Sequence, residues 1–228
     1  MAVSETAFLS LKKNRLRWFT PDKEVSLCGH ATLATIHILR ELNLLEEGVK
    51  TGFETLSGTL YGLFQGSQIE LNFPLLHVEP VPVETLGLKI AALHLSDSDI
   101  EMAGRFSEGK DFIVLSDESK LIGLQPNFSQ LGDIPGRGIV VTTSTQNPEF
   151  DFLTRYFAPW VGVNEDPVTG SAFCALADYW GKRLNQTRLV GYQASSRGGR
   201  VVVSVLPNQR VILAGNAVTV LRGHFDLN

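Results

Sequence analysis

Two short glycine-containing sequences, each followed by an apolar run, are the residues of this chain best placed to bind an anion. Gly29-His30 comes before the apolar stretch Leu33 to Leu39, and Gly170-Ser171 comes before Phe173 to Trp180. A glycine ahead of an apolar helix lets the chain turn sharply and leaves the first amide N–H groups of the helix available. We therefore expect each helix to accept a carboxylate at its N-terminus.

These two sequences belong to a weak internal repeat, which has too few copies and too long a spacing for a solenoid. Each copy contains an aromatic residue two places before a proline, then an acidic residue, then a glycine and the apolar run. The two copies contain Phe19-Thr20-Pro21, Glu24 and Cys28-Gly29-His30-Ala31, and Phe157-Ala158-Pro159, Glu165-Asp166 and Thr169-Gly170-Ser171-Ala172. The repeat predicts two halves of similar architecture.

The apolar runs contain few polar residues, so a helix there is apolar nearly all round and belongs inside a core. A buried helix needs a surrounding sheet, and short β-branched and aromatic segments bounded by Gly, Pro, Asn or Asp predict its strands. The clearest are RLRWF at 15–19, TGFETL at 51–56, FIVLS at 112–116 and GIVVTTS at 138–144. This pattern predicts an α+β fold in which each half is a barrel-like sheet around a central helix.

Three prolines mark the boundary between the halves. Pro74, Pro80 and Pro82 favour an extended linker near residues 74 to 87. We therefore divide the chain into a first half-domain at 1–80 and a second at 81–228, whose last strand can return to the first half.

Composition excludes several classes of protein. Of the 228 residues, 43% are hydrophobic and 19% charged, and the formal net charge is −4 without blocks of like charge. These values predict a globular protein and disfavour a nucleic-acid partner. Without an apolar run of roughly 18 residues or a signal-peptide pattern, we expect a cytoplasmic protein that does not bind membranes.

The remaining motifs do not point to a cofactor or a metal. Cys28 and Cys174 lie far apart, which indicates reduced thiols, and Cys174 falls within an apolar run as a core residue would. His37 falls on the same predicted helix as His30 and is interpreted as a partly buried helix residue. No glycine-rich nucleotide-binding motif is found, so we expect neither a cofactor nor a metal.

Longer segments resemble a known family. SETAF at 4–8, RWFTP at 17–21, EVSLCGHATLAT at 24–35 and RYFAPWVGVNEDPVTGSA at 155–172 are similar to the phenazine-biosynthesis PhzF-like family, in particular its animal members. The order and spacing agree over nearly the whole chain. The resemblance implies the diaminopimelate epimerase fold, with two pseudo-symmetric halves, an active site in the cleft between them, and a homodimer.

The resemblance also implies roles for individual residues. It places the proton-transferring acid/base on Glu5 and further catalytic groups on His30 and Asp166. Gly29, Gly170 and Ser171 would bind the charge of a small anionic substrate. Apolar neighbours of a carboxylate favour its protonated form, which suits a residue that exchanges protons near neutral pH.

Each of these positions also has a purely structural interpretation. Glu5 can be a solvated carboxylate near the end of the chain. Asp166 can cap a helix ahead of Pro167, and Ser171 can cap the helix that follows Gly170.

Two departures from the family leave the function open. Family members usually begin upstream with a strand, a Gly-Asn-Pro turn and a helix, so we expect a shortened first half. Phe173 occupies a position that is commonly His. The first hypothesis is a cofactor-independent isomerase acting on a small molecule. The alternatives are a catalytically degenerate member that acts through protein-protein interaction and a serine hydrolase that uses Ser171, His30 and Asp166.

Overall fold

The structure is a computed structural model that describes residues 5–20, 23–25, 27–107 and 109–223. The chain forms two compact units, one of residues 1–72 with 214–228 and one of residues 73–213. The sequence-based division lay at residue 80. Residues 75–77 belong to the second unit because they bond to it: Leu75 N–H donates to the Gln209 carbonyl and Leu76 N–H to that of Cys174.

The first unit contains one sheet and one helix. Its strands pair in the order β1-β2-β4-β5-β6, with the short β3 paired to β2. The β2–β4 pair is parallel, whereas β1–β2, β4–β5 and β5–β6 are antiparallel. The elements are β1 (Thr6–Ser10), β2 (Arg15–Phe19), β3 (Glu24–Val25), α1 (Gly29–Glu41), β4 (Thr51–Thr55), β5 (Gly58–Gln65) and β6 (Gln68–Pro74).

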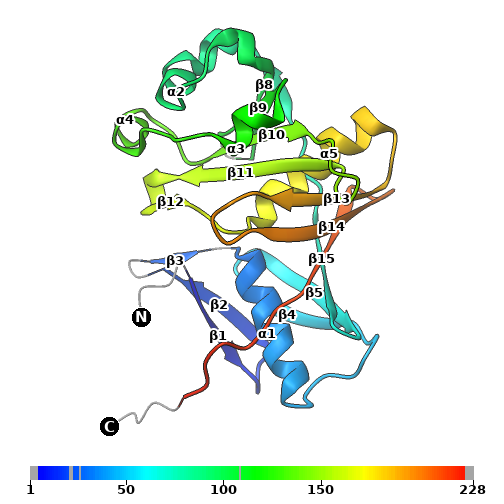
Figure 1. The fold of residues 1–228 in the computed structure, drawn as a ribbon. Coiled ribbons are helices and arrows are strands. Elements are labelled where there is room, and N and C mark those ends of the chain that lie inside the picture. The colour runs from blue at the N-terminus through cyan, green and yellow to red at the C-terminus, as the bar shows by residue number, and fades with distance from the viewer. Residues whose placement is uncertain (1–4, 21–22, 26, 108, 224–228) are drawn as a thin grey trace. The chain divides into compact units, whose positions relative to one another are not determined.

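Helix α1 packs against this sheet through its apolar side (Figure 1). Strand β2 contributes the buried side chains of Leu16 and Trp18. Gly62 on β5 allows a close approach, since a Cβ there would lie 2.3 Å from the Ile36 Cδ1 atom of α1. Ile38 nevertheless exposes 37% of its surface. The prediction of a helix in this region is confirmed, but the prediction that α1 is buried all round is wrong.

The segment after β15 rejoins the first unit at the C-terminal end of α1. The Thr219 hydroxyl donates to the Glu41 carboxylate at 2.7 Å, and Arg222 forms an ion pair with the same carboxylate. His37 Nε2 lies 3.0 Å from Thr219 Oγ1. His37 is thus a buried helix residue with a structural contact, as the sequence predicted.

The second unit is a larger mixed sheet with helices on both faces. Its strands pair in the order β7-β8-β9-β10-β11-β13-β14-β15, with β12 paired to β11. The strands are β7 (Glu79–Val81), β8 (Ile100–Phe106), β9 (Lys110–Leu115), β10 (Ile139–Ser144), β11 (Phe152–Ala158), β12 (Val163–Glu165), β13 (Arg188–Gln193), β14 (Gly199–Leu206) and β15 (Arg210–Gly215). The helices are η1 (Val83–Leu86), α2 (Gly87–Ala92), η2 (Asp97–Asp99), α3 (Glu118–Ile122), α4 (Phe128–Asp133), η3 (Pro159–Val161) and α5 (Gly170–Leu184).

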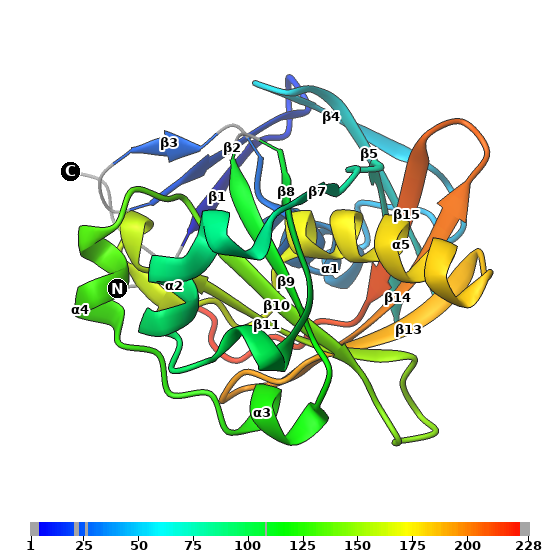
Figure 2. The same cartoon turned by 90° about the horizontal axis from the view of Figure 1, so that it is seen from above.

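Helix α5 covers one face of this sheet, and its residues are buried from Ala172 to Asp178 and at Trp180 (Figure 2). Phe152 of β11 stacks on Trp180 with ring centroids 5.7 Å apart, and the Trp180 indole donates to the Thr142 hydroxyl at 3.0 Å. Phe112 of β9 packs against Tyr179. The prediction of a central, buried helix is confirmed for α5.

The opposite face packs against α2, α3 and α4 (Figure 2). Alternate residues of β9, β10 and β11 point to this side, and because the other face is covered as well, these strands are buried along nearly their whole length. Members of this core are Leu86, Ile90, Leu93, Ile113, Leu115, Leu121, Leu124, Leu131, Ile139, Val141, Leu153 and Phe157. Among the described residues, every helix is too short or too polar to cross a lipid bilayer.

Candidate functional site

In the first unit, the structure brings together two residues that lie far apart in the sequence. Glu5 immediately precedes β1, and His30 is the second residue of α1. Glu5 Oε2 lies 3.0 Å from His30 Nε2. The Glu5 and His30 side chains are 21% and 37% exposed, respectively, so the pair is partly shielded yet open to a small molecule. A carboxylate beside an imidazole is an arrangement that can accept and return a proton.

Cys28 completes this cluster at the N-terminus of α1. Its Sγ atom lies 3.5 Å from His30 Nε2. The Cys28 carbonyl accepts hydrogen bonds from the N–H of Thr32 at 3.2 Å and from its hydroxyl at 2.6 Å. These bonds fix the start of the helix, which begins at Gly29 as predicted.

In the second unit, the predicted anion-binding residues lie at the N-terminus of α5. The helix begins at Gly170, and Ser171 is its second residue. Lys110 of β9 donates from Nζ to the Ser171 hydroxyl at 3.1 Å. An ammonium group here adds positive charge to that of the helix N-terminus. Sequence reasoning missed Lys110, since no motif connects it with the helix.

Asp166 is held by a network of hydrogen bonds ahead of α5. Its Oδ2 accepts from the Thr169 hydroxyl at 2.5 Å, and its carbonyl accepts from Gln193 Nε2 at 2.6 Å. The fully buried Gln193 also accepts from the Thr169 N–H at 2.9 Å. Asp166 is not a helix cap, because Thr169 is the N-cap residue of α5. Gln193 is a second residue that the sequence did not reveal.

Tyr156 is a buried tyrosine that lies close to the Asp166 carboxylate. Burial and, secondarily, the nearby Asp166 carboxylate raise the pKa of the Tyr156 hydroxyl well above its usual value. The Asp166 N–H donates to the Tyr156 carbonyl at 3.1 Å. Tyr156 therefore remains a neutral neighbour of Asp166 throughout the physiological pH range.

The internal repeat corresponds to a repeated ion pair. Arg17 of β2 bonds to Glu24 of β3, and Arg155 of β11 bonds to Glu165 of β12, in both cases through two hydrogen bonds. Each guanidinium also lies over a phenylalanine two residues along its strand, 4.8 Å from the Phe19 centroid and 5.0 Å from that of Phe157.

The repeat then sets equivalent positions at the two helix starts. Glu24 precedes Gly29 by the same number of residues as Glu165 precedes Gly170. Cys28 is therefore the counterpart of Thr169, and His30 that of Ser171. The two helices begin alike, but the groups at their N-termini differ: a thiol and an imidazole at α1, two hydroxyls at α5.

The other residues that the sequence singled out have structural roles. Cys174 is buried in α5, and burial raises the pKa of its thiol to about 12. Phe173 is also fully buried and packs against Phe152.

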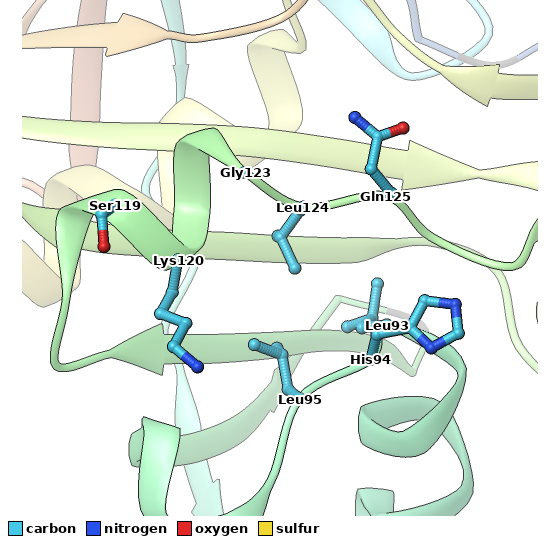
Figure 3. Close-up of a pocket in the computed structure, with 8 residues that line it drawn as sticks. All are labelled: Leu93, His94, Leu95, Ser119, Lys120, Gly123, Leu124 and Gln125. Atoms are coloured by element: carbon cyan, nitrogen blue, oxygen red, sulfur yellow. The ribbon is translucent and has the colours of Figure 1, made fainter.

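A separate pocket of about 190 Å³ lies between the loop after α2 and helix α3 (Figure 3). Three leucines contribute to its lining, and Lys120, also in the lining, is paired with Asp99 at 3.2 Å. None of the predicted site residues lines this pocket. Its lining residues are Leu93, His94, Leu95, Ser119, Lys120, Gly123, Leu124 and Gln125.

Comparison with known proteins agrees with the resemblance found in the sequence. The family model PhzC-PhzF, described as phenazine biosynthesis-like protein, matches residues 1–223. An uncharacterized isomerase from Halalkalibacterium halodurans is 45% identical over 100% of this chain and 84% of its own length. The phenazine biosynthesis-like domain-containing protein 1 of Mus musculus is 36% identical over 98% of this chain and 84% of its own.

Solved structures show the same fold. A phenazine biosynthesis protein of the PhzF family from Enterococcus faecalis superposes with a TM-score of 0.89 at 40% identity, covering 99% of this chain and 84% of that one. A hydroxyproline epimerase from Agrobacterium vitis has a TM-score of 0.59 at 12% identity over 93% of this chain and 72% of that one, a likeness of fold alone. The α+β, epimerase-like fold predicted from the sequence is thus confirmed. From the family match over nearly all its length, the chain belongs to the phenazine biosynthesis-like protein family.

Proposed function

We propose that this protein is an isomerase that moves a proton between positions of a small, carboxylate-bearing substrate, with Glu5 as the proton carrier. The observation that carries the proposal is the contact between Glu5 Oε2 and His30 Nε2 at 3.0 Å. His30 holds the carboxylate in one orientation and can share its proton. The relatives named as isomerases support the general class of reaction.

The substrate carboxylate is proposed to bind at the N-terminus of α5. Three features of the second unit support this: the amide groups at Gly170, the Ser171 hydroxyl and the Lys110 ammonium group beside it. Amides that already point toward an anion need little reorganisation when charge develops on the substrate. Asp166 is proposed to bind a hydroxyl or amino group of the same substrate.

The alternatives from the sequence gain no such support. Phe173 was one reason to expect a degenerate member, but its side chain packs in the core against Phe152, away from the polar groups at the start of α5. A serine hydrolase of the common α/β type would place its serine in a G-x-S-x-G turn, whereas Ser171 follows Thr169-Gly170 and is the second residue of α5. We therefore retain one proposed function.

A solvent-exchange screen tests this proposal. The protein is incubated in heavy water with a panel of small cyclic and unsaturated hydroxy and amino acids, and substrates are analysed by mass spectrometry. We expect deuterium to enter at least one carboxylate-bearing compound, and Asp166→Asn to reduce its rate of entry. Deuterium entry into uncharged amides or esters at equal rates would contradict the proposed carboxylate site.

A further inference from the structure

Three potential metal ligands meet at the start of α1. The side-chain donor atoms of Glu5, Cys28 and His30 all lie within 4.8 Å of one another. Within residues 5–20, 23–25, 27–107 and 109–223, no other group of three His, Cys, Asp or Glu side chains meets the same condition. The sequence did not predict this group because Glu5 joins the other two only through the pairing of β1 with β2 and the packing of β1 on α1.

The chemistry of the three donors is that of a zinc site. Thiolate sulfur, imidazole nitrogen and carboxylate oxygen are the three kinds of protein ligand that Zn²⁺ accepts, and sites with three protein ligands keep a fourth position open. A thiolate disfavours Mg²⁺ and Ca²⁺, which prefer oxygen ligands. The partial exposure of Glu5 and His30 gives an ion a path from solvent.

Two of the three ligand–ligand distances are near those of a tetrahedral site. With Zn–S about 2.3 Å and Zn–N about 2.0–2.1 Å, the sulfur and nitrogen ligands of a tetrahedral ion are about 3.6 Å apart. Cys28 Sγ and His30 Nε2 are 3.5 Å apart. The matching nitrogen–oxygen edge is about 3.4 Å, and the present Glu5–His30 separation is 3.0 Å. The Cys28 sulfur and the Glu5 oxygen lie within 4.8 Å of each other, and a tetrahedral ion would place them about 3.6 Å apart, so a shift of the Glu5 side chain would seat the ion.

The backbone around the cluster is already fixed. The Cys28 carbonyl is bonded twice to Thr32, and the first turn of α1 carries His30. Glu5 is followed directly by β1, whose Thr6 pairs with Phe19 of β2. Ligands on regular elements keep their geometry better than ligands on loops.

We propose that Glu5, Cys28 and His30 form a binding site for Zn²⁺. On binding, a sulfur–zinc bond forms, and the Cys28 thiol proton and the proton between Glu5 Oε2 and His30 Nε2 both pass to solvent. The Glu5–His30 contact is thereby replaced by two bonds to the ion. One consequence rests on the proposed function: zinc occupies the Glu5 carboxylate, so it inhibits the isomerase reversibly and in competition with substrate.

Cobalt spectroscopy tests the site without any need for a substrate. Co²⁺ is titrated into metal-free full-length protein, and thiolate-to-cobalt charge-transfer absorption is recorded in the near ultraviolet. We expect one Co²⁺ per chain with this absorption, and its stoichiometric loss when Zn²⁺ is added. Because loss of a second-shell partner alone lowers metal affinity by about 10- to 100-fold, Cys28→Ala, His30→Ala and Glu5→Gln should each lower it at least as much.

Two control variants test whether the cobalt absorption comes from this site and not from another cysteine or histidine of the chain. Cys174→Ala removes the other cysteine and His94→Asn an exposed histidine, and both should keep the absorption and the affinity of the unchanged protein. All variants are first shown to be folded by circular dichroism. Absence of the thiolate absorption in the folded protein, or its persistence in Cys28→Ala, would overturn the site. Failure of the deuterium screen would leave the cobalt result intact, so the two proposals fail separately.

Discussion

The Arg155 guanidinium holds the Glu165 carboxylate at two points, with Nε–Oε1 and Nη2–Oε2 distances of 2.7 and 2.9 Å. The same guanidinium donates from Nη1 to the carbonyl groups of Leu121 and Leu124. Arg155 therefore connects the C-terminal end of α3 to β12, the strand that directly precedes Asp166. Its counterpart Arg17 pairs with Glu24 at comparable distances but is far more exposed.

Removing the two arginines should have very different effects on stability. Arg155 is 8% exposed, and its loss leaves the Glu165 carboxylate without its ion pair and the Leu124 carbonyl without this donor. Breaking a buried pair by removing one partner costs about 3–5 kcal/mol, so we expect a loss of that order in the free energy of unfolding of Arg155→Met, measured with urea. Arg17→Met should change it much less, since solvent screens an exposed pair. Equal losses for the two variants would contradict this reading.

A second buried ion pair lies in the core of the same unit. The fully buried Asp111 of β9 pairs with the buried Lys89 of α2 and accepts from Arg105 Nε at 3.1 Å. Asp111→Asn keeps the shape but removes the charge opposite Lys89, so we expect it to lower the free energy of unfolding by about 3–5 kcal/mol. Arg105→Gln is the control, because the Arg105 side chain is 45% exposed; a larger loss for Arg105→Gln would refute the assignment.

Lys110 offers a test of the proposed carboxylate site. Its Nζ lies 3.1 Å from the Ser171 hydroxyl at the start of α5. Hydrogen bonds to charged groups contribute about 1.5–3 kcal/mol, so Lys110→Met should raise KM by roughly 10- to 100-fold. Because this interaction is present in both ground and transition states, kcat should change little. Lys110→Arg should recover part of the affinity, and an unchanged KM in Lys110→Met would remove Lys110 from the site.

The stability of the second unit should depend on Asp99 at acidic pH. Hydrogen bonds from the N–H and hydroxyl of Ser96, helped by Lys120, lower the pKa of Asp99 from 3.8 to about 2. A lowered pKa in the folded state stabilises the fold above the unfolded value and loses this contribution as the pH falls toward the folded value. The difference in urea midpoint between wild type and Asp99→Asn should therefore shrink from pH 5 to about pH 2. A difference that stays constant over this range would contradict the assignment.

The regular elements were predictable because their causes are local. The sequence RLRWF alternates between polar and apolar residues, and β2 alternates in burial accordingly, with Leu16 and Trp18 inside. The apolar run after Gly170 was read correctly as a buried helix for the same reason. For α1 the same reasoning failed at Ile38, because the sheet of the first unit covers only part of the helix surface.

The site could be predicted only in part. The catalytic roles of Glu5 and His30 were predicted through the family resemblance. The sequence alone gives no indication that their side chains are in contact, because Glu5 precedes β1 and His30 lies in α1. Lys110 and Gln193 were missed because each reaches its partner from a strand remote in the chain. Such contacts depend on which strands pair in the sheet, and the type of a single residue does not indicate that pairing.

The most direct test of the central claim compares Glu5→Gln with Glu54→Gln in the solvent-exchange assay, with a substrate found in the screen. Both variants remove one carboxylate from the first unit, but Glu54 is an exposed residue of β4. If Glu5 carries the proton, deuterium entry disappears in Glu5→Gln and persists in Glu54→Gln, with both proteins folded. Deuterium entry at the unchanged rate in folded Glu5→Gln would contradict the account.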